Sequence, residues 1–395
     1  MTQISISSQA EATPYRELLK RHGGPLLVLD CQVLSAQCRA LQQALPEVDL
    51  FYAVKSLAQT DALRTVQLAG VGFDLASSGE IDLAKGVGAD PRRTIHTHPI
   101  KRDADIRAAL RFGCTTFVVD NADEIMKFAA YRHRVGLLLR VAFRNDTAVV
   151  DLSRKFGCDL DEVPYLMTLA EKLDLHIKGF SFHVGSQCRD AARHAQAIEF
   201  CNGLIREYAG RGPAPQSILD IGGGFPVPYG EGEVGIEAFC APIRRAMAQL
   251  PPFVQVIAEP GRYLSAPAVK TIATVMGRAV RDGRHWYYLD EGVYGAFSGQ
   301  IYDHAHYPLE VFSDRSERYP SVLAGPTCDS IDVIAEGVDL PELQLGDLVV
   351  GHMMGAYTAV SASNFNSLPK TPIVVVNTFC KTTDESAVKI RNGRA

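Results

Sequence analysis

The feature that most constrains the fold of this chain is an alternation of short apolar runs with segments of helical periodicity between residues 50 and 261. The runs are LFYAVK (50–55), GFDLAS (72–77), TIHTH (94–98), TTFVVD (115–120), VGLLLRV (135–141), IKGFSFHV (177–184), SILDIGGGF (217–225) and VQVIAEPG (254–261). The first five begin about 20–22 residues apart, a spacing that accommodates one strand, one helix and two short loops. Eight such units predict a (β/α)₈ TIM barrel, with an open, doubly wound parallel sheet as the competing interpretation.

The last third of the chain has a different pattern. After about residue 268, stretches such as VKTIATVMGRAV, HWYYLDEGVYGAF and TPIVVVNTF are rich in strand-forming residues and are separated by turns. We therefore expect the barrel to span residues 28–267. We expect residues 268–395, together with the N-terminal residues 1–27, to form a mostly β domain.

Composition excludes several functional classes. The apolar fraction of 47% and the charged fraction of 22% are those of an ordinary globular protein, and a net charge of -5 gives no reason to expect nucleic acid as a partner. No apolar run approaches the roughly 18–20 residues of a membrane span, and the N-terminus lacks the pattern of a secretory leader. The nine cysteines contain no CxxC pair, which favours free thiols in a reducing cytoplasm.

Polar residues stand at equivalent ends of the predicted strands, where the catalytic groups of a (β/α)₈ barrel are found. Taken singly, each has an ordinary explanation, such as a solvated lysine, a core histidine or a tight glycine turn. Their recurrence at successive strand ends favours one shared site. The residues are Lys55, Asp74, Arg140, His183, the glycines Gly222, Gly223 and Gly224, and Glu259, which is followed by Gly261 and Arg262.

These residue types suit one chemistry. Backbone N–H groups of the glycine turn, helped by Ser186 and Arg262, are suited to hold a phosphate. The Lys55 amine in a partly desolvated pocket is suited to form an imine with an aldehyde. Glu259 is placed to keep a pyridine nitrogen protonated, and the His183 imidazole to stack on a flat ring. Phosphate, aldehyde and pyridinium together describe pyridoxal 5′-phosphate.

Ten motifs along the chain then point to a family. They are FYAVK, FDLASSGEI, LSRKFG, FHVGSQ, DIGGGFP, EPGRYL, GVYGAF, YDHAH, GPTCDS and GAYT. In their order and spacing the chain resembles the fold-type III pyridoxal-phosphate-dependent decarboxylases of ornithine, lysine and diaminopimelate, and among these it is most similar to the ornithine decarboxylases. The resemblance implies an alanine-racemase-like barrel, a C-terminal β-barrel or β-sandwich domain, and a head-to-tail homodimer in the cytoplasm.

The resemblance also implies roles for the residues of the barrel. Lys55 matches the lysine that forms the internal Schiff base, and Asp74 and Arg140 match residues that support it and line the cofactor site. His183 matches the histidine stacked on the pyridine ring, and Glu259 the partner of the ring nitrogen. The residues that match phosphate contacts are Ser186, Gly223, Gly224, Gly261, Arg262 and Tyr357.

Further residues match those that act on the substrate. Cys328 and Asp329 in GPTCDS match a pair that is donated across the dimer interface. There the cysteine protonates carbon after CO₂ is lost, and the aspartate contacts the distal amine of the substrate. Tyr302 and Asp303 match the element that recognises the same amine. His304 and His306 next to Asp303 suggest a metal cluster, but no further ligand lies nearby in sequence and the family uses no metal.

Two stretches depart from the family pattern. Ser56 and Leu57 replace the usual small residue and asparagine after the lysine, and HTHPIK (96–101) carries two histidines where small or amide residues are usual. The predicted activity is the decarboxylation of a basic L-amino acid, ornithine (to putrescine, in polyamine biosynthesis) before lysine. The departures keep open a larger amine-bearing substrate, such as citryl-diaminopropionate of siderophore assembly. A racemase is opposed by GPTCDS, and an inactive regulatory homologue by the retained lysine and cysteine.

Overall fold

The computed structural model describes residues 2–143, 155–209, 217–229 and 234–378. The chain divides into two compact units. The barrel unit comprises Ser35–Val227 and Glu233–Leu264, and the β unit comprises Met1–Leu34, Pro228–Gly232 and Ser265–Ala395. None of the helices within the described ranges is long and apolar enough to cross a membrane.

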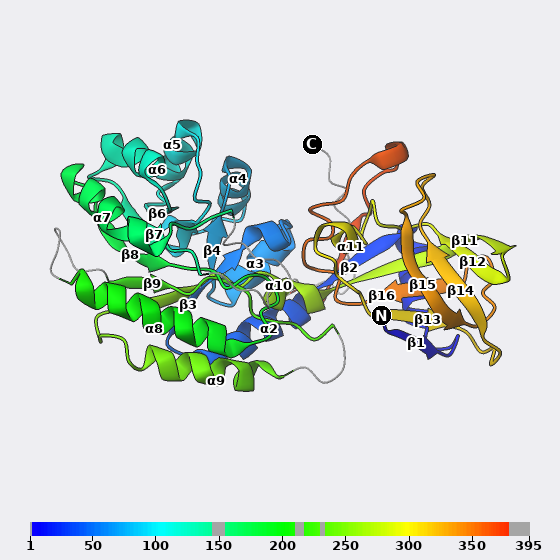
Figure 1. The fold of residues 1–395 in the computed structure, drawn as a ribbon. Helices are drawn as coiled ribbons and strands as arrows, with labels where there is room; N and C mark the ends of the chain where they lie inside the picture. Colours follow the sequence, from blue (N-terminus) through cyan, green and yellow to red (C-terminus); the bar gives the residue numbers. More distant parts are fainter. Residues whose placement is uncertain (1, 144–154, 210–216, 230–233, 379–395) are drawn as a thin grey trace. The chain divides into compact units, whose positions relative to one another are not determined.

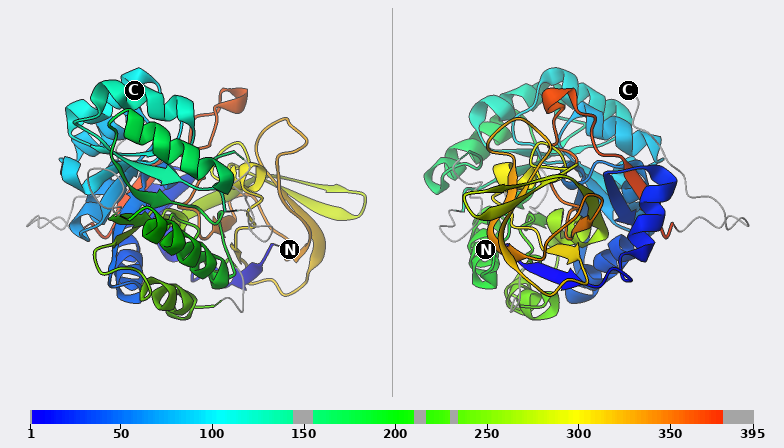
Figure 2. Two further views of the ribbon diagram at one scale, coloured as in Figure 1. Left: turned by 60° about the vertical axis from the view of Figure 1, so that its left-hand side comes forward. Right: turned by 90° about the vertical axis from the view of Figure 1, so that its right-hand side faces the viewer.

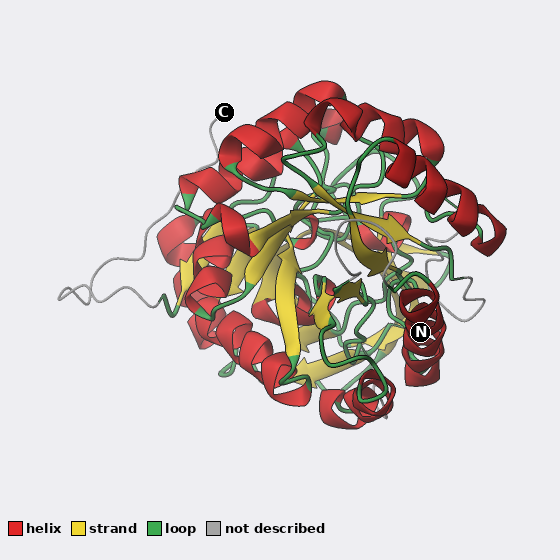
Figure 3. Cartoon of the chain, turned by 90° about the vertical axis from the view of Figure 1, so that its left-hand side faces the viewer, coloured by secondary structure: helices red, strands yellow, loops and turns green. Residues whose placement is uncertain are grey.

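The barrel unit is built on eight parallel strands that close on themselves, because β10 pairs with β3 as well as with β9. The closure confirms the predicted barrel and excludes the open sheet. The strands are β3 (Val48–Ala53), β4 (Gly72–Leu75), β5 (Thr94–His96), β6 (Thr116–Val119), β7 (Gly136–Arg140), β8 (Ile177–Ser181), β9 (Ile218–Asp220) and β10 (Gln255–Ala258). Figure 3 shows them as a ring with the helices around it.

The helices of this unit follow the strands in turn, as the sequence pattern predicts. They are α3 (Thr60–Leu68), α4 (Ser78–Gly86), α5 (Asp103–Phe112), α6 (Ala122–Lys127), α7 (Val163–Lys172), α8 (Ala191–Glu207) and α9 (Ile236–Met247), while α2 (Cys31–Ala44) precedes β3 and α10 (Arg262–Ser265) follows β10. Local signals define their ends. Ser77 caps α4 and Asn121 caps α6 by accepting a backbone N–H in the first turn, and Gly113 ends α5 in the left-handed conformation, with φ 106°.

The barrel interior is apolar. Phe51, Ile95, Val118, Leu138 and Ile257 come from five different strands and form one buried cluster. Burying side chains of this size stabilises a fold by about 1.5–3 kcal/mol each. The cluster therefore holds the barrel together and leaves the strand ends to carry polar residues.

The β unit contains a nine-stranded mixed sheet with the order β1-β13-β16-β11-β12-β14-β15, in which β2 also pairs with β11 and β17 pairs with β2. Its strands are β1 (Ile4–Ser7), β2 (Leu26–Asp30), β11 (Val269–Arg281), β12 (Arg284–Leu289), β13 (Leu309–Phe312), β14 (Tyr319–Ala324), β15 (Val333–Leu340), β16 (Leu348–Gly351) and β17 (Ile373–Val376). Figure 1 labels the elements, and in Figure 2 the antiparallel pair β11 and β12 (yellow-green) forms a long hairpin. The mostly β character predicted for this part of the chain is confirmed.

The N-terminal segment supplies two elements to the β unit. Helix α1 (Thr13–His22) packs Tyr15, Leu18 and Leu19 against a buried cluster that includes Ile272 and Phe312. Strand β2 pairs with both β11 and β17. The expected boundary after residue 27 falls inside β2, whose hydrogen bonds keep the whole strand in this sheet.

Candidate active site

The lysine of FYAVKS lies in a turn rather than in a strand. Strand β3 ends at Ala53, and Val54–Ser56 form the 3₁₀ helix η1. The buried Ser56 Oγ lies 2.9 Å from the Ala53 carbonyl oxygen and 3.0 Å from the Tyr52 hydroxyl oxygen, and the Tyr52 hydroxyl donates to the Leu57 carbonyl at 3.3 Å. The two residues that depart from the family motif therefore anchor the turn from inside, which leaves the Lys55 side chain 45% exposed.

Lys55 forms an ion pair with a carboxylate on the neighbouring strand. Its Nζ lies 2.9 Å from Asp74 Oδ2, and the Asp74 side chain is fully buried. The Thr97 hydroxyl donates to the other oxygen, Oδ1. A buried carboxylate is tolerated only with such partners, so the Lys55 amine is held at the rim by a group that has no access to water.

Sequence reasoning missed a second carboxyl group beside this pair. Glu80 lies in the first turn of α4 and accepts a hydrogen bond from the Ala76 N–H at 2.6 Å. Burial raises the pKa of Glu80 to about 7, and the charge of Asp74 adds to the rise while that of Lys55 opposes it. The only sequence signal at Glu80 is the S-x-x-E pattern in SSGE, which is typical of the start of a helix and does not indicate a functional site. The tertiary structure turns this capping residue into a group that titrates near neutral pH.

The predicted ring-nitrogen partner has a carboxyl neighbour of its own. Glu259 follows β10, and Asp220 ends the adjacent strand β9. Burial and the charge of Asp220 raise the pKa of Glu259 well above its ordinary value, and burial raises the pKa of Asp220 to about 6. Two neighbouring buried carboxyl groups disfavour each other's ionisation, because like charges repel strongly away from water. No role was predicted for Asp220, because in the sequence it resembles any other residue at the end of the strand that precedes the glycines.

Arg140 and His183 lie near this carboxyl pair. Burial lowers the pKa of Arg140, while the charges of Glu259 and other carboxylates oppose the change. The Arg140 guanidinium lies over the Phe156 ring at 5.5 Å. His183 Nδ1 accepts a hydrogen bond from the Gly185 N–H at 2.9 Å, which places the ring proton on Nε2. Burial and the charges of Arg140 and Lys55 lower the pKa of His183 well below its ordinary value, so the imidazole is neutral.

The triple glycine follows β9 where three backbone segments meet. A Cβ on Gly222, with φ +66°, would lie 2.4 Å from the Phe182 carbonyl oxygen, and a Cβ on Gly223 would lie 2.7 Å from that of Glu259. The Gly223 carbonyl is in turn 3.1 Å from Nε2 of His194, a fully buried residue of α8. Burial lowers the pKa of His194 to about 4, so the neutral ring donates Nε2–H. No sequence signal pointed to this histidine.

A cation and a hydroxyl group complete an anion cradle. Arg262 Nε and Nη2 donate to Ser186 Oγ at 3.3 and 3.2 Å. Ser186 follows β8, Gly224 follows β9 and Arg262 follows β10, and these three strands are neighbours. Only glycine fits the turn between them, because a Cβ on Gly224 would lie 2.4 Å from the Gly185 carbonyl oxygen. The residues present fit pyridoxal 5′-phosphate, with a cation and a hydroxyl group suited to an anion, an amine, and a buried carboxyl pair on one rim.

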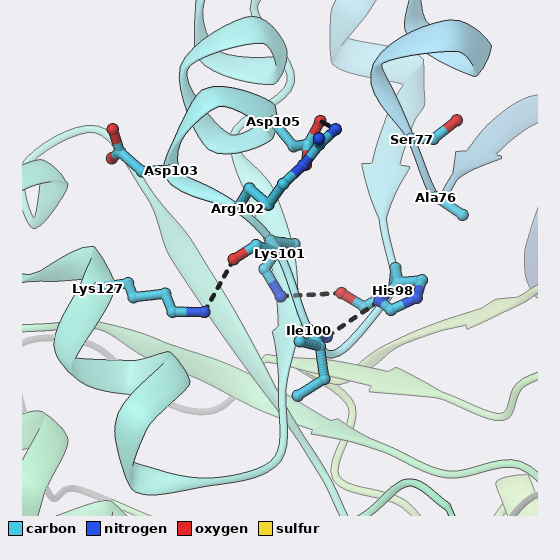
Figure 4. Close-up of a pocket in the computed structure, with 9 residues that line it drawn as sticks. All are labelled: Ala76, Ser77, His98, Ile100, Lys101, Arg102, Asp103, Asp105 and Lys127. Carbon is cyan, nitrogen blue, oxygen red and sulfur yellow. Dashed lines mark hydrogen bonds and ion pairs between the residues drawn. The ribbon is translucent and has the colours of Figure 1, made fainter.

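A pocket of about 440 Å³ lies on the same rim, between the loops that follow β4 and β5 (Figure 4). The buried Lys101 Nζ donates to the carbonyls of His98 and Pro99 at 2.9 and 2.7 Å, which holds the HTHPIK loop in place. His98 lines the pocket and contacts the Phe156 ring edge-on at 5.6 Å. His96 is fully buried, 5.7 Å from the Phe117 ring. Of the two extra histidines, one is a core residue and the other lines the pocket beside Phe156, whose ring the Arg140 guanidinium covers.

The remaining predicted residues lie in the β unit. Asp329 accepts a hydrogen bond from the Tyr294 hydroxyl at 2.5 Å, and this bond lowers the pKa of Asp329. Cys328, beside it, is exposed. Tyr302 ends the short helix α11 (Gly299–Tyr302) with its side chain exposed, and Asp303 follows it. Tyr294 belongs to the GVYGAF motif, yet sequence reasoning gave it no role because its contact with Asp329 spans 35 residues.

The predicted phosphate contact Tyr357 also belongs to this unit. Its backbone is in the left-handed region, with φ 56°, which is uncommon for a tyrosine. Its carbonyl accepts a hydrogen bond from the Ser361 hydroxyl at 2.7 Å, which stabilises that conformation. The predicted set is therefore divided, with the phosphate contacts other than Tyr357 in the barrel unit.

Residues 32–266 match the family model described as pyridoxal-dependent decarboxylase, pyridoxal binding domain. The chain belongs to this family. Lysine/ornithine decarboxylase of Selenomonas ruminantium is 37% identical over 361 residues, which is 91% of each chain. Antizyme inhibitor 2 of Xenopus laevis is 36% identical over 84% of this chain and 76% of its own.

The solved structures agree with this assignment. Lysine/ornithine decarboxylase of Vibrio vulnificus in complex with putrescine has 47% sequence identity and a TM-score of 0.89, and the match covers 94% of this chain and 99% of that one. The complex of that enzyme with cadaverine has 46% identity and the same TM-score, and covers 96% and 100%. This decarboxylase is thus a pyridoxal-phosphate-dependent carboxy-lyase, as the ten motifs predicted.

Proposed function

We propose that this decarboxylase converts L-ornithine and L-lysine to putrescine and cadaverine with release of CO₂. The observation that carries the proposal is its near full-length similarity to a lysine/ornithine decarboxylase that was solved with both diamines. The carboxylate of Asp329 supports it, because its hydrogen bond from Tyr294 stabilises the charged form that a distal ammonium group requires.

Each residue of the site then has a task. Bound pyridoxal phosphate supplies an electron sink for the electron pair that CO₂ leaves behind. Lys55 is the amine that would hold its aldehyde, and Glu259 the carboxyl group that would hold the proton at the ring nitrogen. His183 would present a neutral ring face, and Arg262 with the glycine turn would bind the phosphate. Asp74 keeps the Lys55 amine at the rim by the 2.9 Å ion pair.

The substrate-directed residues complete the proposal. Asp303 and Asp329 would bind the distal ammonium group, with Tyr302 beside them. Cys328 would donate a proton to the carbon that has lost its carboxylate, because a thiol is acidic enough to protonate carbon. These roles are taken from the family resemblance. Each of the four residues carries a chemical group of the type that its proposed role needs.

Release of CO₂ from a panel of L-amino acids tests the substrate. The panel contains ornithine, lysine, arginine, diaminopimelate and citryl-diaminopropionate. We expect the highest kcat/KM for ornithine and lysine. Preference for citryl-diaminopropionate would replace the proposal by the siderophore alternative. Racemisation without CO₂, or no turnover with bound cofactor, would favour the racemase or the inactive homologue, a possibility that the similarity to antizyme inhibitor 2 keeps relevant.

We further propose that the enzyme acts in the cytoplasm as a homodimer, in which Cys328 and Asp329 serve the site of the partner subunit. The Lys55→Ala and Cys328→Ala variants are each expected to be inactive. Mixing them in equal amounts should restore about a quarter of the wild-type activity, because half of the dimers would contain one intact site. Absence of recovery after demonstrated subunit exchange would refute the shared site.

A further inference from the structure

The side chain of Asn366 binds Cys328 through two hydrogen bonds. Cys328 lies in the loop after β14, and Asn366 lies in the 3₁₀ helix η6 (Phe365–Ser367), 38 residues later. Asn366 Oδ1 accepts the backbone N–H of Cys328 at 3.1 Å and lies 3.4 Å from Cys328 Sγ. A backbone N–H can only donate, so the atom facing it must be the amide oxygen. The thiol faces the same oxygen and must also donate, which requires that it keep its proton.

The backbone of η6 is shaped to direct this amide. Asn366 has φ 53° and ψ 20°, a left-handed conformation that asparagine tolerates better than most residues do. The preceding residue, Phe365, stacks on the Tyr294 ring with centroids 4.3 Å apart, and Tyr294 donates to Asp329. Asn366 therefore contacts Cys328 directly, whereas Phe365 supports the tyrosine that donates to Asp329.

We propose that Asn366 is a positioning residue that holds Cys328 as a protonated thiol and sets the direction of its S–H bond. The inference builds on the proposed role of Cys328 as the proton donor. A neutral amide oxygen accepts from S–H but has no proton to donate to a thiolate, so the contact is made by the protonated thiol. A proton donor needs this, because a thiolate has no proton to give to carbon.

The test compares the Asn366→Ala and Asn366→Asp variants of the holoenzyme by the pH profile of Cys328 alkylation with iodoacetamide. Thiolate is the species that reacts, and among the described residues Cys328 is the exposed cysteine. The Cys328→Ser variant measures the background from all other cysteines. Loss of one hydrogen bond should raise the rate for Asn366→Ala at neutral pH by about three- to tenfold. The carboxylate of Asn366→Asp should lower the rate and displace the profile to higher pH.

Activity gives the second readout. Both variants should lose kcat with little change in KM, since neither alters the residues proposed to bind the substrate. Asn364→Ala is the matched control, because Asn364 is exposed and makes no side-chain cap hydrogen bond at the start of η6. It should leave both the alkylation profile and kcat unchanged.

The outcomes separate the inference from the proposed function. Equal profiles for wild type, Asn366→Ala and Asn366→Asp would overturn the role of Asn366, as would a shift in the same direction for both variants. Asn366→Asp preserves the size of the side chain, so it keeps the test decisive if Asn366→Ala fails to fold. Opposite shifts in alkylation with an unchanged kcat would overturn Cys328 as the proton donor, and with it the catalytic part of the inference.

Discussion

Replacement of Asp332 should loosen the GPTCDS loop, because its buried side chain ties this loop to the rest of the β unit. Its side chain is 2% exposed. Oδ1 accepts the Val293 N–H at 2.8 Å, and Oδ2 accepts the N–H and the hydroxyl of Thr327 at 3.0 and 2.7 Å. One carboxylate thereby joins the GVYGAF loop, which carries Tyr294, to the loop that carries Cys328 and Asp329.

The magnitude follows from the donors that lose their acceptor. In Asp332→Asn the amide oxygen is expected to keep the hydrogen bond from the Val293 N–H. The new NH₂ group then faces the part-buried Thr327 N–H, and two donors cannot bond to each other. The Thr327 hydroxyl can rotate and accept a hydrogen bond from the NH₂ group. One unsatisfied donor costs about 1–2 kcal/mol of the free energy of unfolding. Asp332→Ala leaves both backbone donors without a partner and adds a cavity, which should cost about 3–5 kcal/mol.

Urea denaturation of the holoenzyme, analysed with a common slope, measures both costs. Asp339→Asn on the exposed face of β15 is the control and should stay within about 0.5 kcal/mol of wild type. CO₂ release should fall in the order wild type, Asp332→Asn, Asp332→Ala, because the proposed proton donor loses its fixed position. An Asp332→Ala variant as stable as the control would refute the reasoning, since it would show that the three hydrogen bonds contribute nothing.

Two further predictions concern the barrel unit. Gly223→Ala forces a Cβ to within 2.7 Å of the Glu259 carbonyl oxygen, so pyridoxal phosphate should bind about tenfold or more weakly by absorbance titration. Gly203→Ala in α8, with open space around the added Cβ, should bind it normally. Burial raises the pKa of Asp220 from 3.8 to about 6, so the stability that this group contributes is full below pH 3.8 and is lost as pH rises through about 6. In calorimetry of the cofactor-free protein, the wild type should therefore lose Tm relative to Asp220→Asn across that window, and parallel curves would contradict the shift.

Much of the fold followed from the order of residues along the chain. Each barrel strand pairs with its neighbour in sequence, so the period of about 20–22 residues was enough to predict the barrel. The β domain was predicted only as a class, since its sheet joins strands such as β2 and β11 that are far apart in sequence. For the same reason the pattern could not show that residues 28–30 belong to that sheet, nor that Lys55 lies in a turn after β3 rather than in it.

The sequence by itself determined which kinds of group stand at the rim, because parallel strands of a barrel bring their carboxyl ends to one face and the chain lists those ends in order. Lys55, Asp74, His183 and Glu259 could be named on that basis. Only the tertiary structure decided which groups are buried together and which hold one another by hydrogen bonds. Glu80, Asp220, His194, Tyr294 and Asn366 act through burial and through contacts of 2.5–3.4 Å, and neither proton affinity nor hydrogen bonding can be read from spacing when the partners are brought together by folding.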